Sequence, residues 1–195
     1  MIAGPLVAAG RAFDRLGRAL THLAGSTMRV AEIQEGTADS WSAFHSTDDE
    51  IESGFMDWER ALVAQFVRPG DSVLIVGSGT GRDTIAFLSA GCRVTGVEPS
   101  AAAVARARQA VAKYGGGATF IQRFIADVTI DERFDAISFS NLTYSYIPER
   151  ARRVAVLRRT AGWLAPRGRM FVSFITVPHP PAGSLHRLAR WWGAM

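Results

Sequence analysis

The stretch Val73–Gly81 reads VLIVGSGTG and joins two different patterns. Its apolar half belongs to a nearly continuous apolar run over 72–76, which is typical of a strand buried on both faces. Its other half has glycine at every second position from Gly77 to Gly81, so three side chains are missing from one side of a turn. A ligand can approach the backbone closely there, and the helix that follows directs free N–H groups toward the same space. The stretch indicates a nucleotide-like ligand, although glycines alone fit a purely structural turn equally well.

Glu98 ends the next strand-like segment and is followed by Pro99. The carboxyl ends of parallel strands meet at one edge of a sheet, so this carboxylate is placed to accept hydrogen bonds from both ribose hydroxyls of a nucleoside. A dinucleotide fingerprint requires a third glycine at position 82, where the chain has Arg82, and no P-loop lysine follows. The spacing therefore favours a nucleoside cofactor over a nicotinamide dinucleotide or a P-loop phosphate site.

Strand and helix patterns alternate along the rest of the chain. Strands are predicted over 72–76, 93–97, 119–122, 134–140 and 169–176, with helices over 81–89, 100–114 and 149–164 and a tight turn over 165–168. On the last helix, Val154, Leu157, Ala161 and Leu164 are expected to face inward. This alternation implies right-handed crossovers. The predicted fold class is α/β, a doubly wound, mostly parallel Rossmann-like sheet of about five strands with helices on both faces.

The segments before the first strand are predicted to be helical with one loop between them. Residues 11–23 form an amphipathic pattern that suits a helix on its own domain, on a partner or on a membrane surface. Residues 25–40 are small and polar, and are expected to form a loop. A second helix is expected from the acidic start at 48–50 to about Val67. The boundary between an N-terminal helix with a lid segment (1–47) and the main domain (48–195) follows from this, with Trp41 and His45 as candidate lid residues.

Composition and charge narrow the class of protein. The chain has a net charge of +4 and 48% hydrophobic residues, ordinary values for a globular domain, and no apolar run long enough to cross a bilayer. A single cysteine, Cys92, excludes an internal disulfide, so cytoplasmic conditions suit the chain. The charges are acidic over 32–59 and all arginine after Glu149, but no aromatic residues alternate with the arginines, so nucleic-acid binding is a minority interpretation. Nothing in the sequence suggests a metal site or fixes an oligomeric state.

Five ordered motifs then give a resemblance over about residues 50–175. The glycine turn at 77–81 and the acidic strand end at 94–100 resemble the first two motifs of class I S-adenosylmethionine-dependent methyltransferases, of the small-molecule type. Segments 126–128, 134–137 and 164–169 resemble the third strand region, the opening of the fourth strand and the turn into the fifth. The resemblance implies S-adenosyl-L-methionine as cofactor, bound by Gly77, Ser78, Gly79, Thr80, Gly81, Glu98, Pro99, Asp127, Val128 and Asn141.

The resemblance implies a methyltransferase that acts on O, N or C of a small or medium-sized acceptor, with the acceptor site beyond the fourth strand. No catalytic residue is predicted, because the sulfonium is already activated and a general base is optional. Ile75 stands where that family usually carries an acid that helps hold the methionine end. One alternative is therefore an inactive methyltransferase-like scaffold, and another, disfavoured by Arg82, is a nicotinamide oxidoreductase. The family's last two strands are apparently missing after Thr176, which indicates a C-terminal truncation or a reduced variant.

Overall fold

A computed structural model describes residues 3–42 and 47–174 of the chain. The chain divides into two units by its internal contacts. The described part of the first consists mainly of helix α1 (Ala3–Thr27), whose apolar residues Phe13, Leu16 and Leu20 are exposed. The second unit, Gln34–Ile175, contains the sheet and every residue of the site described below.

The sheet has five strands in the order β3-β2-β1-β4-β5, and all neighbouring pairs are parallel. The strands are β1 (Ser72–Val76), β2 (Arg93–Val97), β3 (Ala118–Ile121), β4 (Phe134–Phe139) and β5 (Leu164–Val172). The chain proceeds from β1 outward to β3 on one side, then returns to place β4 on the other side of β1. The strand order therefore reverses beside β1, and the carboxyl end of β1 is where an open α/β sheet binds its ligand.

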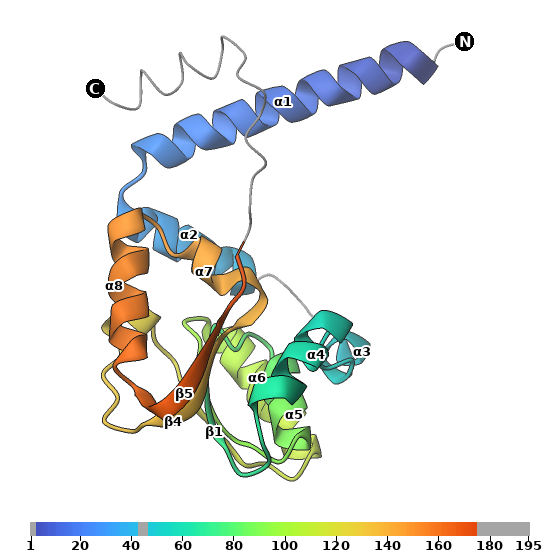
Figure 1. Cartoon of the computed structure of the whole chain (residues 1–195). Helices are drawn as coiled ribbons and strands as arrows, with labels where there is room; N and C mark the ends of the chain where they lie inside the picture. The colour runs from blue at the N-terminus through green and yellow to red at the C-terminus, as the bar shows by residue number, and fades with distance from the viewer. Residues whose placement is uncertain (1–2, 43–46, 175–195) are drawn as a thin grey trace. The chain divides into compact units, whose positions relative to one another are not determined.

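Helices cover both faces of this sheet (Figure 1). The helices after α1 are α2 (Val30–Ser42), α3 (Asp48–Glu52), α4 (Asp57–Phe66), α5 (Arg82–Ser89), α6 (Ala101–Lys113), α7 (Thr143–Tyr146) and α8 (Arg150–Ala161), with short 3-10 turns at Ile125–Asp127 and Ser140–Leu142. Of these, α8 packs on one face of the sheet and α4 and α5 pack on the other. The doubly wound α/β class predicted from the alternating pattern is confirmed.

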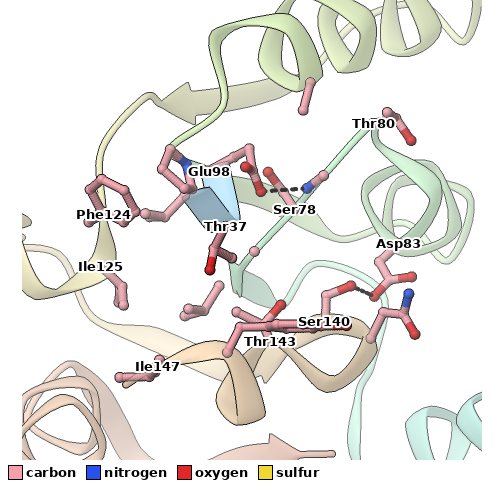
Figure 2. A pocket seen from close by; sticks show the side chains of 18 of the residues that line it. Thr37, Ser78, Thr80, Asp83, Glu98, Phe124, Ile125, Ser140, Thr143 and Ile147 are labelled. Atoms are coloured by element: carbon pink, nitrogen blue, oxygen red, sulfur yellow. Dashed lines mark hydrogen bonds between the residues drawn. The ribbon is translucent and has the colours of Figure 1, made fainter. Parts of the chain in front are cut away.

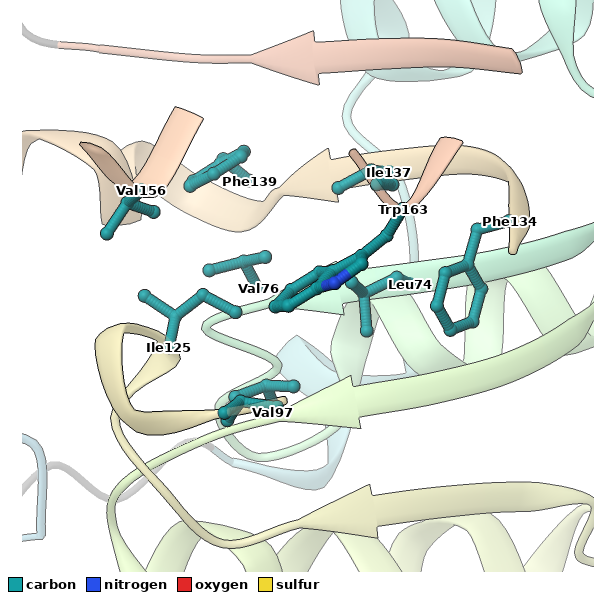
Figure 3. Packing of buried hydrophobic residues seen from close by; sticks show 10 residues of the cluster. Leu74, Val76, Val97, Ile125, Phe134, Ile137, Phe139, Val156 and Trp163 are labelled. Atoms are coloured by element: carbon teal, nitrogen blue, oxygen red, sulfur yellow. The ribbon is translucent and has the colours of Figure 1, made fainter. Parts of the chain in front are cut away.

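Alternate residues of β1 supply the core on each face, because successive strand side chains point to opposite sides. On one face, Leu74 and Val76 pack with Val156 of α8 and with Trp163, as Figure 3 shows. On the other face, Val73 and Ile75 pack with Phe87 of α5. All five residues of β1 are buried. This accounts for the uninterrupted apolar run that marks the strand in the sequence.

Two predictions before β1 are wrong. The predicted loop at 25–40 is helical, since α1 continues to Thr27 and α2 begins at Val30, where the backbone N–H of Arg29 donates to Glu32 Oε2 at 2.6 Å. The single helix predicted from 48 to about 67 is two helices, α3 and α4. Gly54 interrupts them with φ +66°, a conformation that no α-helix can include. The small, polar residues at 25–40 predict a loop, but one of the polar side chains, Glu32, caps the first turn of α2 and so serves a helix.

Two predictions after β4 are also corrected. Residues 165–168 are part of β5 rather than a tight turn, and they form an irregularity in its pairing with β4, with Arg167 at φ +68°. The inward positions of α8 are Val156 and Thr160. Leu157 and Leu164 are half-buried and pack against the core as predicted, whereas Val154 is half-buried and Ala161 is exposed. The buried face of α8 therefore includes Val156 and Thr160 and leaves out Ala161.

Asp135 links the beginnings of β1 and β4. Its Oδ2 accepts hydrogen bonds from the backbone N–H and the hydroxyl of Ser72, each at 2.9 Å. These two donors, the backbone one first, hold the pKa of Asp135 below its ordinary value. A carboxylate with a lowered pKa in the folded state stabilises the fold above its unfolded pKa, and that contribution is lost as the pH falls through the folded value.

We expect Asp135→Ala to lower the free energy of unfolding at pH 7 by about 1–3 kcal/mol, the scale for hydrogen bonds to a charged group. The difference from the wild type should shrink as the pH falls below about 4 and through the lowered pKa of the folded state, where the carboxylate becomes protonated. Urea denaturation across this pH range measures it, with the exposed Asp131→Ala as the control. A loss that stays constant with pH would contradict the assignment.

Candidate functional site

A cavity of about 380 Å³ lies at the carboxyl ends of β1, β2 and β4. Its walls come from the turn after β1, the tip of β2, the segment after β3, the segment after β4 and the helices α2 and α3. Figure 2 shows Thr37 of α2 together with residues from these strand ends. The cavity therefore occupies the switch point predicted from the strand order.

The glycine turn forms one wall, and two of its glycines are required for different reasons. At Gly77, φ is +73° and an added Cβ would lie 2.1 Å from the hydroxyl oxygen of Thr143. At Gly79, φ is +53° and an added Cβ would meet no atom within 4 Å. The first glycine allows two segments of the protein to touch, whereas the second leaves open space beside a backbone that lines the cavity. Such a surface fits close approach by a ligand.

Glu98 is buried at the tip of β2 and faces the glycine turn. Its Oε2 accepts a hydrogen bond from the backbone N–H of Gly79 at 3.1 Å, and its Oε1 accepts one from Ser100 at 3.0 Å. Burial raises the pKa of Glu98, and the two backbone donors oppose that rise. A carboxylate has about four acceptor positions. Two are used here, so Glu98 retains capacity to accept hydrogen bonds from hydroxyl groups of a ligand.

Ser78 adds to the same wall a polar group that lacks a hydrogen-bond partner among the described residues. Its hydroxyl oxygen is buried, and among the described residues it has no hydrogen-bond partner. The side chain fits against the backbone of Gly96, where an added Cβ would lie 2.8 Å from the Ser78 oxygen. Buried polar groups are normally paired. A polar ligand in the cavity is one source of the missing partner.

Arg82, Asp83 and Ser140 also line the cavity, and hydrogen bonds link them with Glu59 in one network. Arg82 donates from Nε to Asp83 Oδ1 at 2.7 Å and from Nη2 to Glu59 Oε1 at 2.9 Å. The other Asp83 oxygen accepts a hydrogen bond from the Ser140 hydroxyl. Burial lowers the pKa of Arg82, but the two carboxylates outweigh it and raise the pKa above its ordinary value. Arg82 is therefore a fixed cation within the described part of the chain.

The segment after β4 is strained. Asn141 and Leu142 have φ of 35° and 66°, values that residues with a side chain rarely adopt. Ser173, which follows β5, bridges the segment, because its hydroxyl accepts from the Leu142 N–H at 3.0 Å and donates to the Phe139 carbonyl at 3.3 Å. Strained backbone of this kind concentrates at functional sites. Here it places Asn141 in the cavity wall.

The structure brings most of the predicted site residues together. Seven line the cavity, namely Gly77, Ser78, Gly79, Thr80, Glu98, Pro99 and Asn141. Gly81, Asp127 and Val128 are not among its lining residues: Gly81 packs against Ala107, Asp127 is exposed on a 3-10 turn, and Val128 is buried in the core. Phe124 and Ile125, which precede Asp127, line the cavity instead.

Sequence reasoning missed the charged network and the helical wall. Asp83 has a detectable signal, since it is an acid in the first turn of the helix after the glycines. Its partners Ser140 and Glu59 lie far away in the sequence and carry no local signal. Thr37 lies in the segment that was expected to be a loop. The candidate lid residue His45, and His179 near the end of the chain, lie outside the described residues, as does the side chain of Trp41.

Residues 3–42 and 47–174 contain no group of three or more His, Cys, Asp or Glu side chains that could hold a metal ion. None of the helices in this part of the chain is long and apolar enough to cross a membrane.

Comparisons with known proteins agree with this geometry. Residues 73–168 match the family described as "Methyltransferase domain". A curated relative, the cypemycin N-terminal methyltransferase of a Streptomyces species, is 29% identical over 103 residues, which are 53% of this chain and 41% of the relative. The chain therefore spans less than half the length of that relative.

Solved structures are similar in fold. The glycopeptide N-methyltransferase MtfA, complexed with S-adenosyl-L-methionine, is 24% identical with a TM-score of 0.53, over 63% of this chain and 53% of that one. The amino pentose methyltransferase CalS10 of Micromonospora echinaspora is 21% identical with a TM-score of 0.55, over 80% of this chain and 60% of that one. At these identities the likeness concerns the fold, and it confirms the Rossmann-like arrangement.

Two glycine variants should separate the roles of the turn. Gly79→Ala should cost only about 1–2 kcal/mol of unfolding free energy, the strain of a left-handed backbone, because its Cβ meets open space. Gly77→Ala should cost about 1–3 kcal/mol more, because its Cβ collides with Thr143. Denaturant titration of both proteins measures the difference, and equal losses would contradict the close contact at Gly77.

Proposed function

Residues 73–168 belong to the methyltransferase-domain family, and on this premise we propose that the chain binds S-adenosyl-L-methionine in the cavity and transfers its methyl group to a small or medium-sized acceptor. The observation that carries the proposal is the position of Glu98. Its buried carboxylate lies against the Gly79 backbone, in the cavity at the switch point of the sheet. A nucleoside with free ribose hydroxyls suits this carboxylate.

The residues present fit such a cofactor on four points. The spare acceptor positions of Glu98 suit a ribose diol. The backbone at Gly79 leaves space that a side chain would fill. The hydroxyl of Ser78 lacks a partner among the described residues. Phe124 and Ile125 line the cavity on the side of Glu98 and supply apolar surface for an adenine ring. The adenine role predicted for Asp127 stays a prediction, as do the roles of Gly81 and Val128.

When bound, the cofactor supplies a methyl group already activated by its sulfonium. The chain then has to position an acceptor in line and exclude water. Asn141, Thr143 and Tyr146 line the cavity after β4 and are suited to contact an acceptor through amide and hydroxyl groups. The strained backbone at Asn141, bridged by Ser173, fixes the position of this wall.

The atom of the acceptor that receives the methyl group is a separate part of the proposal. The curated relative is named as an N-terminal methyltransferase and MtfA as an N-methyltransferase. Nitrogen is therefore the first acceptor atom to test, with oxygen and carbon as the alternatives. A panel of small primary and secondary amines, with S-adenosyl-L-methionine labelled in its methyl group, tests the transfer directly. Calorimetry with S-adenosyl-L-methionine tests the binding step alone, and a folded protein that gives no binding would overturn the proposal.

Glu98→Ala should weaken binding of S-adenosyl-L-methionine by about 1–3 kcal/mol, or about 5-fold to 150-fold, because hydrogen bonds to a charged group are lost. Calorimetry at pH 7 measures the change. Glu132→Ala, which removes an exposed carboxylate outside the cavity lining, is the matched control and should bind as the wild type does. Unchanged affinity in Glu98→Ala would remove Glu98 from the site.

A further inference from the structure

Asp83 is a buried carboxylate that lines the cavity, and the role proposed for Glu98 does not use it. It is 3% exposed and lies in the first turn of α5, directly after the glycine turn. Figure 2 shows Asp83 and Glu98 on opposite sides of that turn, with Thr80 at its far end. A ligand in the cavity can therefore meet a carboxylate on either side of the turn.

The charges around Asp83 do not balance. Two buried carboxylates, Glu59 and Asp83, share the single guanidinium of Arg82. The third group, Ser140, is a neutral hydroxyl. Among the described residues, the network therefore carries one negative charge more than it neutralises, in surroundings where unpaired charge is expensive. A ligand that brings a positive charge to this end of the cavity would stabilise it.

Asp83 also has acceptor capacity to spare. One of its oxygens accepts from Arg82 and the other from Ser140, while a carboxylate offers about four acceptor positions. The remaining positions suit a donor with several N–H groups. A primary ammonium provides three, whereas a sulfonium provides none.

We propose that Asp83 binds the α-amino group of the cofactor, so that Glu98 and Asp83 divide the ligand between them, ribose on one side of the glycine turn and ammonium on the other. This assignment rests on the proposed function, since it takes S-adenosyl-L-methionine as the ligand. Ile75, two residues before the first glycine, is fully buried on the sheet face that packs against Phe87 and has no polar atom to offer. Asp83 supplies the negative charge from the helix that follows.

Three ligands that differ only in their amino-acid end test the assignment. They are S-adenosylhomocysteine, its analogue with hydrogen in place of the amino group, and 5′-methylthioadenosine, which lacks the whole amino-acid end. Asp83→Asn should weaken S-adenosylhomocysteine by at least about tenfold, because a charged hydrogen bond is lost. The other two ligands should bind the variant within about twofold of the wild type, since neither carries the ammonium. Calorimetry at pH 7 measures all the affinities.

Glu59→Gln is the matched control, because Glu59 belongs to the same ionic network but is not among the residues that line the cavity. It should not distinguish S-adenosylhomocysteine from 5′-methylthioadenosine. If it gives the same selective loss as Asp83→Asn, net charge rather than contact explains the effect, and the assignment is overturned. Equal weakening of all three ligands by Asp83→Asn would overturn it too.

The wild type alone decides the matter if Asp83→Asn does not fold. It should bind S-adenosylhomocysteine at least about tenfold more tightly than the analogue without the amino group. Equal affinities would overturn the role of Asp83 while leaving the proposed function intact. A wild type that binds none of the three ligands would overturn the proposed function itself, so the two failures can be told apart.

Discussion

The contact between Gly77 and Thr143 is the constraint on which the site depends. No side chain fits at Gly77, because the Thr143 side chain occupies the space where a Cβ would stand. The N–H groups of Gly77 and Ser78 both donate to the carbonyl of Val97, at 2.8 Å and 3.2 Å. One turn is thus fixed against the end of β2 and against the segment after β4. The three strand ends that surround the cavity are held together by this arrangement, and the parallel order of the strands brings them to the same edge.

The same edge collects most of the unfavourable features of the fold. Glu98 is buried with a raised pKa, Ser78 lacks a partner among the described residues, and Asn141 and Leu142 have left-handed backbones. Each feature costs free energy that the apolar layers on the two sheet faces must offset. A fold selected only for stability would not gather them in one cavity. Their concentration beside open space is what binding a polar ligand requires, since the ligand can satisfy groups that the protein leaves unsatisfied.

Sequence alone was sufficient where a feature is local. β1 has the predicted bounds, and α6 begins one residue after the predicted start at Ser100, which caps it. Burial on both faces and N-capping each leave a signal within a few residues. Glu98 was identified from its separation along the sequence from the glycine turn. The split between α3 and α4 was missed, because the apolar period continues across Gly54. Asp83 was missed as a site residue, because its meaning depends on Ser140 and Glu59, which only the folded chain brings near.

Ile75 is one of two grounds for the inactive-scaffold alternative, beside the missing last strands, and its surroundings weaken this ground. β1 presents Ile75 to the core that contains Phe87, so an acid there would have to reach the ligand from the packed face of the sheet. Asp83 reaches the same cavity from the first turn of α5, where helix N–H groups and Arg82 stabilise a carboxylate. A negative charge that moves from the strand to the helix can serve the same ligand without disturbing the core. An apolar residue at position 75 is therefore compatible with the proposed binding of the cofactor.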